Sequence, residues 1–132
     1  MPWNYLRWLL PILWMGVIFF LSAQSYPPIP DIFIGWFPLP VGKAGHVGEY
    51  TILAILAYVA LRNLSSKRTR VGSVFLLCLL YAFSDELHQS FVPNRDPSLW
   101  DVGLDALGAA LGLLLIILLS LLLKGRGAAK GQ

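Results

Sequence analysis

The fold is decided by the stretch VGSVFLLCLLYAF, residues 71–83, and by the five residues DELHQ, 85–89, that follow it. A helix that crosses a membrane needs about 20 residues, so the apolar stretch alone is too short. To cross, it must continue to about Phe91, which places two carboxylates, an imidazole and an amide inside it. Ionisable groups are costly in a bilayer and usually face the protein interior or a water-filled cavity, where they serve a function. The junction therefore predicts both a membrane helix and the place where the protein acts.

The composition supports a membrane protein. The chain has 132 residues, of which 57% are hydrophobic and 13% charged, and its mean hydropathy is +0.67. A soluble domain carries about 25% charged residues. We therefore expect one integral membrane domain over residues 1–132. The net charge of +3 does not indicate a nucleic-acid partner, because no basic patch with interleaved aromatic residues is present. The single cysteine, Cys78, excludes an internal disulfide and a Cys-rich metal site.

Four apolar segments predict an all-α, four-helix transmembrane bundle. Their hydrophobicity is continuous and does not alternate, which favours helices over the strands of a barrel. The predicted spans are residues 6–23, 43–61, 71–91 and 99–123.

The positive charges predict the orientation. Eight of the ten Lys and Arg residues lie near the N-terminus, between the second and third spans, or after the fourth span. The other two, Lys43 and Arg95, lie on the opposite side. Cytoplasmic loops carry the excess of Lys and Arg, so we expect both termini to be cytoplasmic.

The connection over residues 25–42 combines two opposing signals. Its five prolines exclude a regular helix. Its aromatic and aliphatic side chains favour a position at the outer membrane surface. Two interpretations stay open here, a stiff aromatic anchor and a lid over the region beneath it.

The predicted topology places unusual polar residues at one depth, in the outer half of the second, third and fourth spans. The second span presents Lys43, His46 and Tyr50 on one helical stripe. Because three helices contribute, we expect one outward-facing pocket. Its candidate residues are Lys43, His46, Glu49, Tyr50, Asp85, Glu86, Gln89, Arg95, Asp101 and Asp105.

The fourth span has a stripe of a different kind. Asp101 and Asp105 share a face with Gly108 and Gly112. This spacing of small residues is typical of helices whose backbones approach closely in a membrane. We therefore expect the glycines to contact a neighbouring helix and the Leu/Ile face to contact lipid.

Three interpretations of the polar residues compete. Acids outnumber the bases Lys43 and Arg95 at this depth, so some acids must be protonated, hydrated or neutralised by a cation. In the first interpretation they form a satisfied network that only sets helix register. In the second they line a binding or catalytic pocket. In the third they start a proton or ion path, which the apolar inner halves of the spans disfavour.

A metal or cofactor is not predicted. His46 and Glu49 are close in sequence, but the second histidine of an H-E-x-x-H site is missing. A divalent ion stays open as an alternative, and the many carboxylates would suit Mg, Ca or Mn more than Zn. No G-x-S-x-G motif is present, which argues against a serine hydrolase.

The motifs, taken in order, resemble those of the VanZ-like family of small bacterial membrane proteins. They are K-x-x-H-x-x-x-Y at 43–50, D-E-x-x-Q at 85–89, F-V-P-x-R at 91–95, and Asp101 with its two glycines. Asn94 replaces an expected glycine, and asparagine also tolerates a positive φ.

The resemblance implies a multi-pass protein of the bacterial plasma membrane, with membrane lipids as partners. It links the chain to teicoplanin and glycopeptide tolerance, a form of antibiotic resistance, and more broadly to the cell envelope. We expect the pocket to bind a lipopeptide antibiotic, a lipoglycopeptide or a lipid-linked envelope molecule. An enzyme that modifies such a molecule is the alternative, with Asp85 or Glu86 as general base and His46 or Lys43 as its electrostatic partner. The absence of a clear nucleophile favours binding.

Overall fold

The described part of the chain is helical. A computed structural model describes residues 3–25, 41–64 and 66–129. It contains one short helix, α1 (Trp3–Leu6), and four longer ones: α2 (Leu9–Ser22), α3 (Val41–Ala60), α4 (Lys67–Gln89) and α5 (Leu99–Ala129). The predicted all-α fold with four main helices is confirmed. Most of the 25–42 connection, predicted as an anchor or a lid, lies outside the described residues.

Two helix starts differ from the predicted spans. The first span is interrupted before Leu9 because Pro11 has no N–H to donate to the carbonyl of Arg7 and its ring crowds that carbonyl. The third begins at Lys67, four residues before Val71, because the side chain of Ser66 accepts a hydrogen bond from the Thr69 amide. Local chemistry at the ends, which hydrophobicity does not report, explains both differences.

Helices α3 and α5 pack more extensively on each other than any other pair. A methyl group added to Gly108 would overlap the Val47 carbonyl oxygen, and one added to Gly112 would overlap that of Thr51. The Thr51 hydroxyl donates to the Val47 oxygen at 2.7 Å and the Gly108 oxygen at 3.0 Å. The predicted close approach of the glycine stripe is thus confirmed.

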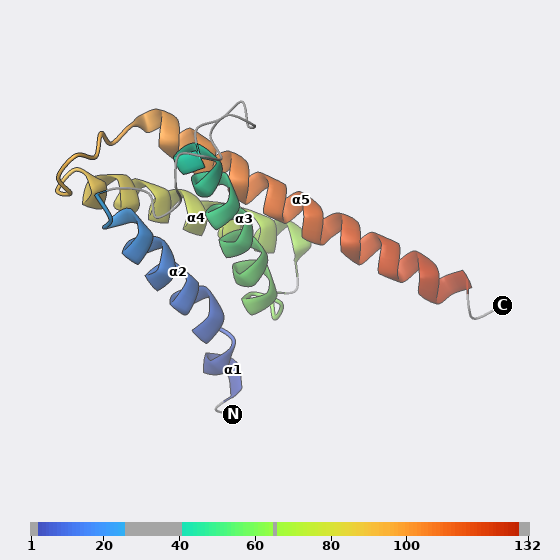
Figure 1. Cartoon of the computed structure of the whole chain (residues 1–132). Coiled ribbons are helices and arrows are strands. Elements are labelled where there is room, and N and C mark those ends of the chain that lie inside the picture. The colour runs from blue at the N-terminus through green and yellow to red at the C-terminus, as the bar shows by residue number, and fades with distance from the viewer. Residues whose placement is uncertain (1–2, 26–40, 65, 130–132) are drawn as a thin grey trace.

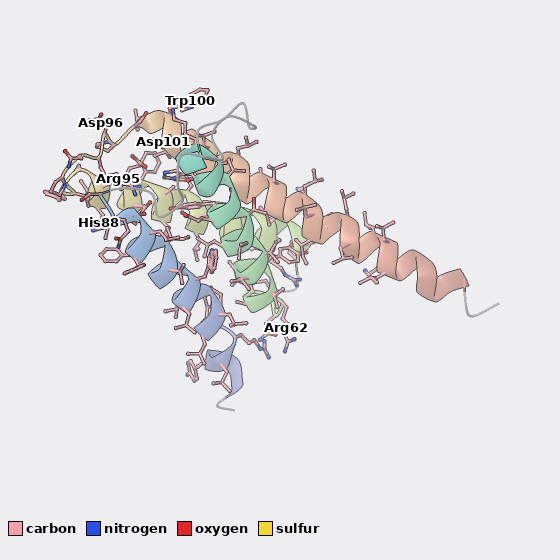
Figure 2. All side chains as sticks on the ribbon, in the orientation of Figure 1. Arg62, His88, Arg95, Asp96, Trp100 and Asp101 are labelled. Atoms are coloured by element: carbon pink, nitrogen blue, oxygen red, sulfur yellow. The ribbon has the colours of Figure 1, made fainter. Side chains whose placement is uncertain are left out.

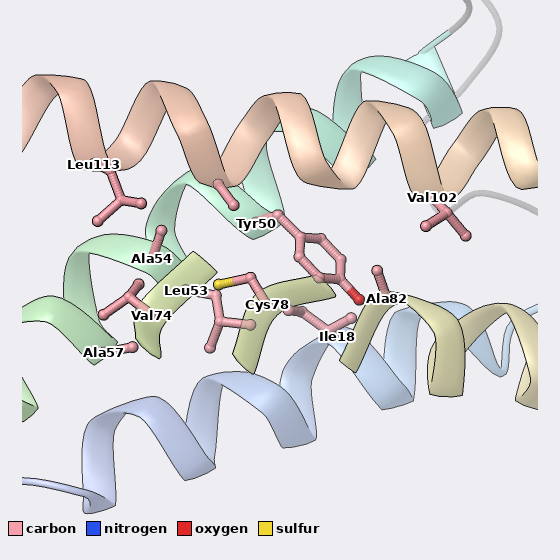
Figure 3. Close-up of a cluster of buried hydrophobic side chains, with 11 residues drawn as sticks. Ile18, Tyr50, Leu53, Ala54, Ala57, Val74, Cys78, Ala82, Val102 and Leu113 are labelled. Carbon is pink, nitrogen blue, oxygen red and sulfur yellow. The ribbon is translucent and has the colours of Figure 1, made fainter. Parts of the chain in front are cut away.

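Small and branched side chains fill the core between the helices (Figure 3). Tyr50 is fully buried, and its hydroxyl points toward Ala82. The other core residues include Ile18 from α2 and Cys78 from α4, so all four long helices meet there.

Two helices are long and apolar enough to cross a membrane, Lys67–Gln89 and Leu99–Lys124. The 14-residue α2 is apolar but shorter, and the first turns of α3 are rich in glycine and polar residues. Large apolar side chains are exposed along the helices, for example Phe20 on α2 and Leu122 on α5. Contiguous exposed apolar surface of this kind marks a membrane or interaction site.

Candidate functional site

The predicted site residues lie at one end of the helical assembly. There the last turn of α2, the first turns of α3 and α5, and the last turn of α4 come together (Figure 1). Figure 2 shows Arg95, Asp96 and Asp101 at this end and Arg62 at the opposite one. We call this region the polar end. It forms because the loop 90–98 returns the chain from α4 to α5 without leaving that end.

His46 and Asp105 form the contact that joins α3 to α5 at the polar end. The Nδ1 of His46 lies 2.9 Å from Oδ1 of Asp105. The side chain of Asp105 is fully buried, and that of His46 is 12% exposed. With Nδ1 directed at a carboxylate, the pair fixes the ring orientation and leaves Nε2 for another partner.

The carboxylates of Asp85 and Glu86 share one amide. Gln89 Nε2 donates to Oδ2 of Asp85 at 3.0 Å and is 3.4 Å from Oε1 of Glu86. The main-chain N–H of Ser98 donates to the second oxygen of Glu86 at 2.8 Å. All three α4 side chains are buried. Glu86 therefore ties α4 to the start of α5, and two acids lie side by side in the interior.

A small polar cavity opens beside these acids. Its volume is about 170 Å³. Positive, negative and amide groups line it together, which suits a charged ligand. Its lining residues are Gly42, Lys43, His46, Gln89, Asn94, Arg95, Asp96 and Asp101.

Arg95 serves a second purpose at the wall of the cavity. Its Nε donates to the Gln24 carbonyl at 2.9 Å, and its Nη2 donates to the Leu21 carbonyl at 3.2 Å. These carbonyls lie at the C-terminal end of α2 and in its following turn, where helix carbonyls lack their usual partner four residues on. The Leu21 carbonyl also accepts a hydrogen bond from the Gln24 amide. Arg95 therefore fastens α2 to the loop before α5. Asn94 has a φ of 63°, a conformation that asparagine tolerates.

Several buried oxygens at the polar end have no hydrogen-bond partner among the described residues. They are the Tyr50 hydroxyl, Oδ1 of Asp85, Oδ1 of Asp101 and Oδ2 of Asp105. Within residues 3–25, 41–64 and 66–129, His46–Asp105 is the one ion pair closer than 4 Å. Buried polar groups in proteins are normally satisfied, so an unsatisfied group requires an explanation. These four oxygens are what the first interpretation, a satisfied network, does not account for.

The remaining predicted residues take different positions. Tyr50 lies beneath the site at the top of the core. Glu49 is half-buried, and its main-chain oxygen accepts a hydrogen bond of 2.8 Å from Trp14 on α2. His88, which was not among the predicted site residues, stacks on Phe19 with the ring centroids 4.2 Å apart.

Sequence reasoning missed four contributors, the backbone N–H of Ser98 and the lining residues Gly42, Asn94 and Asp96. The backbone N–H of Ser98 carries no side-chain signal, so its bond to Glu86 could not be inferred. The three lining residues reach the cavity because of where the chain turns around them. Only the turn sequence P-N-R-D-P, residues 93–97, hinted that this loop would fold back over the site.

The comparisons with known proteins agree with this description. A family model described as VanZ/LLP1 matches residues 7–120, which confirms the resemblance predicted from the motifs. There is no match among curated proteins or among solved structures.

Proposed function

We propose that this chain, which belongs to the VanZ/LLP1 family, crosses the bacterial plasma membrane four times with both termini in the cytoplasm. The family match and the two apolar helices suggest a membrane protein. The exposed leucines of α5 and the distribution of Lys and Arg support the finer topology. Helix α2 is about 21 Å long, short of a hydrocarbon core of about 30 Å, and α1 extends it across the break.

In this topology the polar end opens at the outer leaflet. We infer that its cavity binds the charged head of a lipid-linked cell-envelope molecule or of a lipopeptide antibiotic. Lys43 offers an ammonium group to a phosphate or carboxylate. Arg95 donates hydrogen bonds from Nε and Nη2 to carbonyls at the end of α2. Its Nη1 is therefore the nitrogen left for a ligand.

The observation that carries this proposal is the buried acids with unsatisfied oxygens. Burying a charge without a partner is expensive, and a core of apolar residues would avoid that expense. A protein that tolerates it at Asp85, and leaves one oxygen of Asp101 and one of Asp105 without a hydrogen bond from the described residues, gains something other than stability. Binding sites are the usual reason for such an arrangement.

The size of the cavity restricts the ligand. Pockets that enclose a whole drug-sized molecule measure about 300–1,000 Å³, whereas this cavity measures about 170 Å³. It can hold a headgroup fragment such as a phosphate, but not an entire glycopeptide. A second, apolar groove of about 500 Å³ runs between α2 and α4, lined by Met15, Leu77 and Tyr81 among others. An acyl or prenyl chain fits such a groove, which favours the lipid-linked ligand.

Glycopeptide tolerance enters this proposal through the resemblance to VanZ-like proteins. A protein that holds the head of a lipid-linked envelope molecule can change how much of that molecule an antibiotic reaches at the outer surface. In this proposal, teicoplanin tolerance is a consequence of envelope binding.

An enzyme acting on the same molecule is the second candidate. The observation that favours it is the His46–Asp105 contact, in which a carboxylate holds the imidazole in a fixed orientation. Asp85 or Glu86 would then serve as general base, with His46 or Lys43 as the electrostatic partner.

Glu86→Gln tests the proposed function. Its carboxylate has no cationic partner within 4 Å among the described residues, so neutralisation leaves no buried cation unpaired. We expect thermal stability in detergent within about 1 kcal/mol of wild type, the value of one neutral hydrogen bond. Native mass spectrometry should show a co-purified lipid-linked molecule on wild type and not on the variant, and the envelope or tolerance phenotype should be lost.

Leu114→Ala is the control, because Leu114 is half-exposed on the apolar face of α5. A Glu86→Gln protein that keeps both adduct and phenotype would refute the binding site. One that is absent from the membrane would support a purely structural role for the polar residues.

A further inference from the structure

Three side chains at the polar end are arranged as ligands for a metal ion. A ring nitrogen of His46, an oxygen of Asp85 and an oxygen of Glu86 all lie within 4.8 Å of one another. They come from two helices, so neither helix alone would reveal the group. The sequence offered His46 and five acids as possible ligands, and its spacing did not select these three among them.

The distances require a modest closure. Ligand atoms around a tetrahedral zinc ion, with bonds of 2.0–2.1 Å, are roughly 3.3 Å apart. The present separation of up to 4.8 Å therefore has to shrink by about 1.5 Å at most, which side-chain rotations can supply. No movement of α3 or α4 as a whole is needed.

The unsatisfied oxygen of Asp85 is an independent observation that points to a ligand. Asp85 is 3% exposed, and its Oδ1 has no hydrogen-bond partner among the described residues. Its other oxygen accepts from Gln89. A buried oxygen left free next to a second carboxylate and an imidazole is what a cation requires.

Asp105 supplies the outer contact that metal-binding histidines usually have. Such a histidine donates its second ring nitrogen to a carboxylate or carbonyl, which fixes the ring and makes it a better ligand. The 2.9 Å contact from His46 Nδ1 to Asp105 fulfils this role and assigns Nε2 to the metal. Asp105 is thus a positioning residue.

From these observations we propose that His46, Asp85 and Glu86 bind a divalent transition-metal ion, Zn²⁺ or Mn²⁺. One imidazole and two carboxylates suit these ions, whereas Ca²⁺ needs six to eight oxygen ligands. His46 also lines the polar cavity, so the remaining coordination position faces the place proposed for the headgroup. The metal site does not depend on the proposed function, because ion binding can be measured without any lipid ligand.

The experiment uses the full chain purified in detergent through a tag other than polyhistidine, stripped with a chelator and titrated with ZnCl₂ or MnCl₂. We expect one equivalent of Zn²⁺ or Mn²⁺ per chain, measured by calorimetry and, for Mn²⁺, by electron paramagnetic resonance. Asp85→Asn, Glu86→Gln and His46→Gln should lose this uptake. Asp105→Asn should keep the stoichiometry but weaken affinity about 10- to 100-fold.

His88→Gln is the matched histidine control, because His88 stacks on Phe19 away from the group, and it should bind like wild type. Wild-type protein that takes up no equivalent of either ion overturns the proposal, whatever the variants do. Binding that survives all three ligand substitutions, or binding of Mg²⁺ or Ca²⁺ alone, overturns the assigned ligands. Loss of metal binding without loss of the lipid adduct would separate this site from the proposed function.

Discussion

Charged side chains have different surroundings at the two ends of helix α3. At its start, in the polar end, His46 is almost buried and neighbouring acids keep unsatisfied oxygens. At its finish, Arg62 is exposed, and Arg70 donates to the carbonyls of Arg62 and Leu64 at 2.7 and 2.6 Å. Arg70 also lies 5.1 Å from the centre of the Tyr58 ring, within cation–π range.

This difference distinguishes charged residues that anchor a helix from charged residues that form a site. Anchoring charges are exposed, as Arg62 is, or donate to nearby backbone carbonyls, as Nη2 of Arg70 does while its Nε has no partner in the described part of the chain. At the polar end the acids Asp85 and Asp105 are buried, and each keeps one oxygen without a partner among the described residues. Both ends are rich in ionisable residues, so composition alone does not distinguish them.

The largest expected effect is an all-or-none difference in accessibility between the ends. Pro97→Cys lies in the exposed loop at the polar end and Asn63→Cys at the opposite end, each in a background with Cys78→Ala. An impermeant thiol reagent added to intact cells should label residue 97 and not residue 63. The reverse pattern would place the polar end in the cytoplasm and contradict a pocket open to the outer leaflet.

A large loss of stability should follow from filling the contact between α3 and α5. Gly108→Ala places a methyl group against the Val47 carbonyl, and overpacking of this kind costs about 1–3 kcal/mol or more. Thermal unfolding in detergent measures the loss. Gly103→Ala is the matched control on the same helix, because nothing lies within 4 Å of its added carbon. Equal stability of the two variants would show that the close approach does not support the polar end.

The smallest expected effect is a difference between the Arg95→Ala and Arg70→Ala variants. Arg95→Ala and Arg70→Ala each remove two hydrogen bonds from a charged donor to a carbonyl. Such bonds are worth about 1.5–3 kcal/mol each when buried and less when exposed, so both variants should unfold at lower temperature. Only Arg95 lines the cavity, so only Arg95→Ala should also lose the lipid adduct.

The lipid adduct should be measured where the two arginine variants are equally stable, for instance at temperatures equally far below the unfolding midpoint of each. Loss of the adduct in both arginine variants would mean that the two ends do not differ in function.

Much of the helical architecture was predictable, because long apolar runs are a strong signal. The stripe of Gly108 and Gly112 also predicted a close contact with a neighbouring helix, because small residues at that spacing are typical of such contacts in membranes. The break before Leu9 was not predicted, although Pro11 was visible, because a proline in the first turn of a helix is normally tolerated.

That these residues lie together could be expected from the sequence, but the contacts among them could not. Residues from three helices were expected together because they share one depth. Which acid faces His46 depends on how α3 and α5 rotate about their axes, and helical spacing within each segment does not give that rotation. The pairing with Asp105, the bond from Ser98 to Glu86 and the use of Arg95 on α2 therefore required the structure.

The Thr51 hydroxyl, which bridges the Val47 and Gly108 carbonyls, sets a limit on how this chain can change length. It fixes the phase of α3 against α5 a short distance from His46 and Asp105. One residue inserted between His46 and Val47 would turn the imidazole by about 100° around the helix axis while the contacts of Val47 and Thr51 with the glycines stayed in place. Insertions and deletions should therefore be tolerated in the loops and excluded from the helix segments between these two contacts.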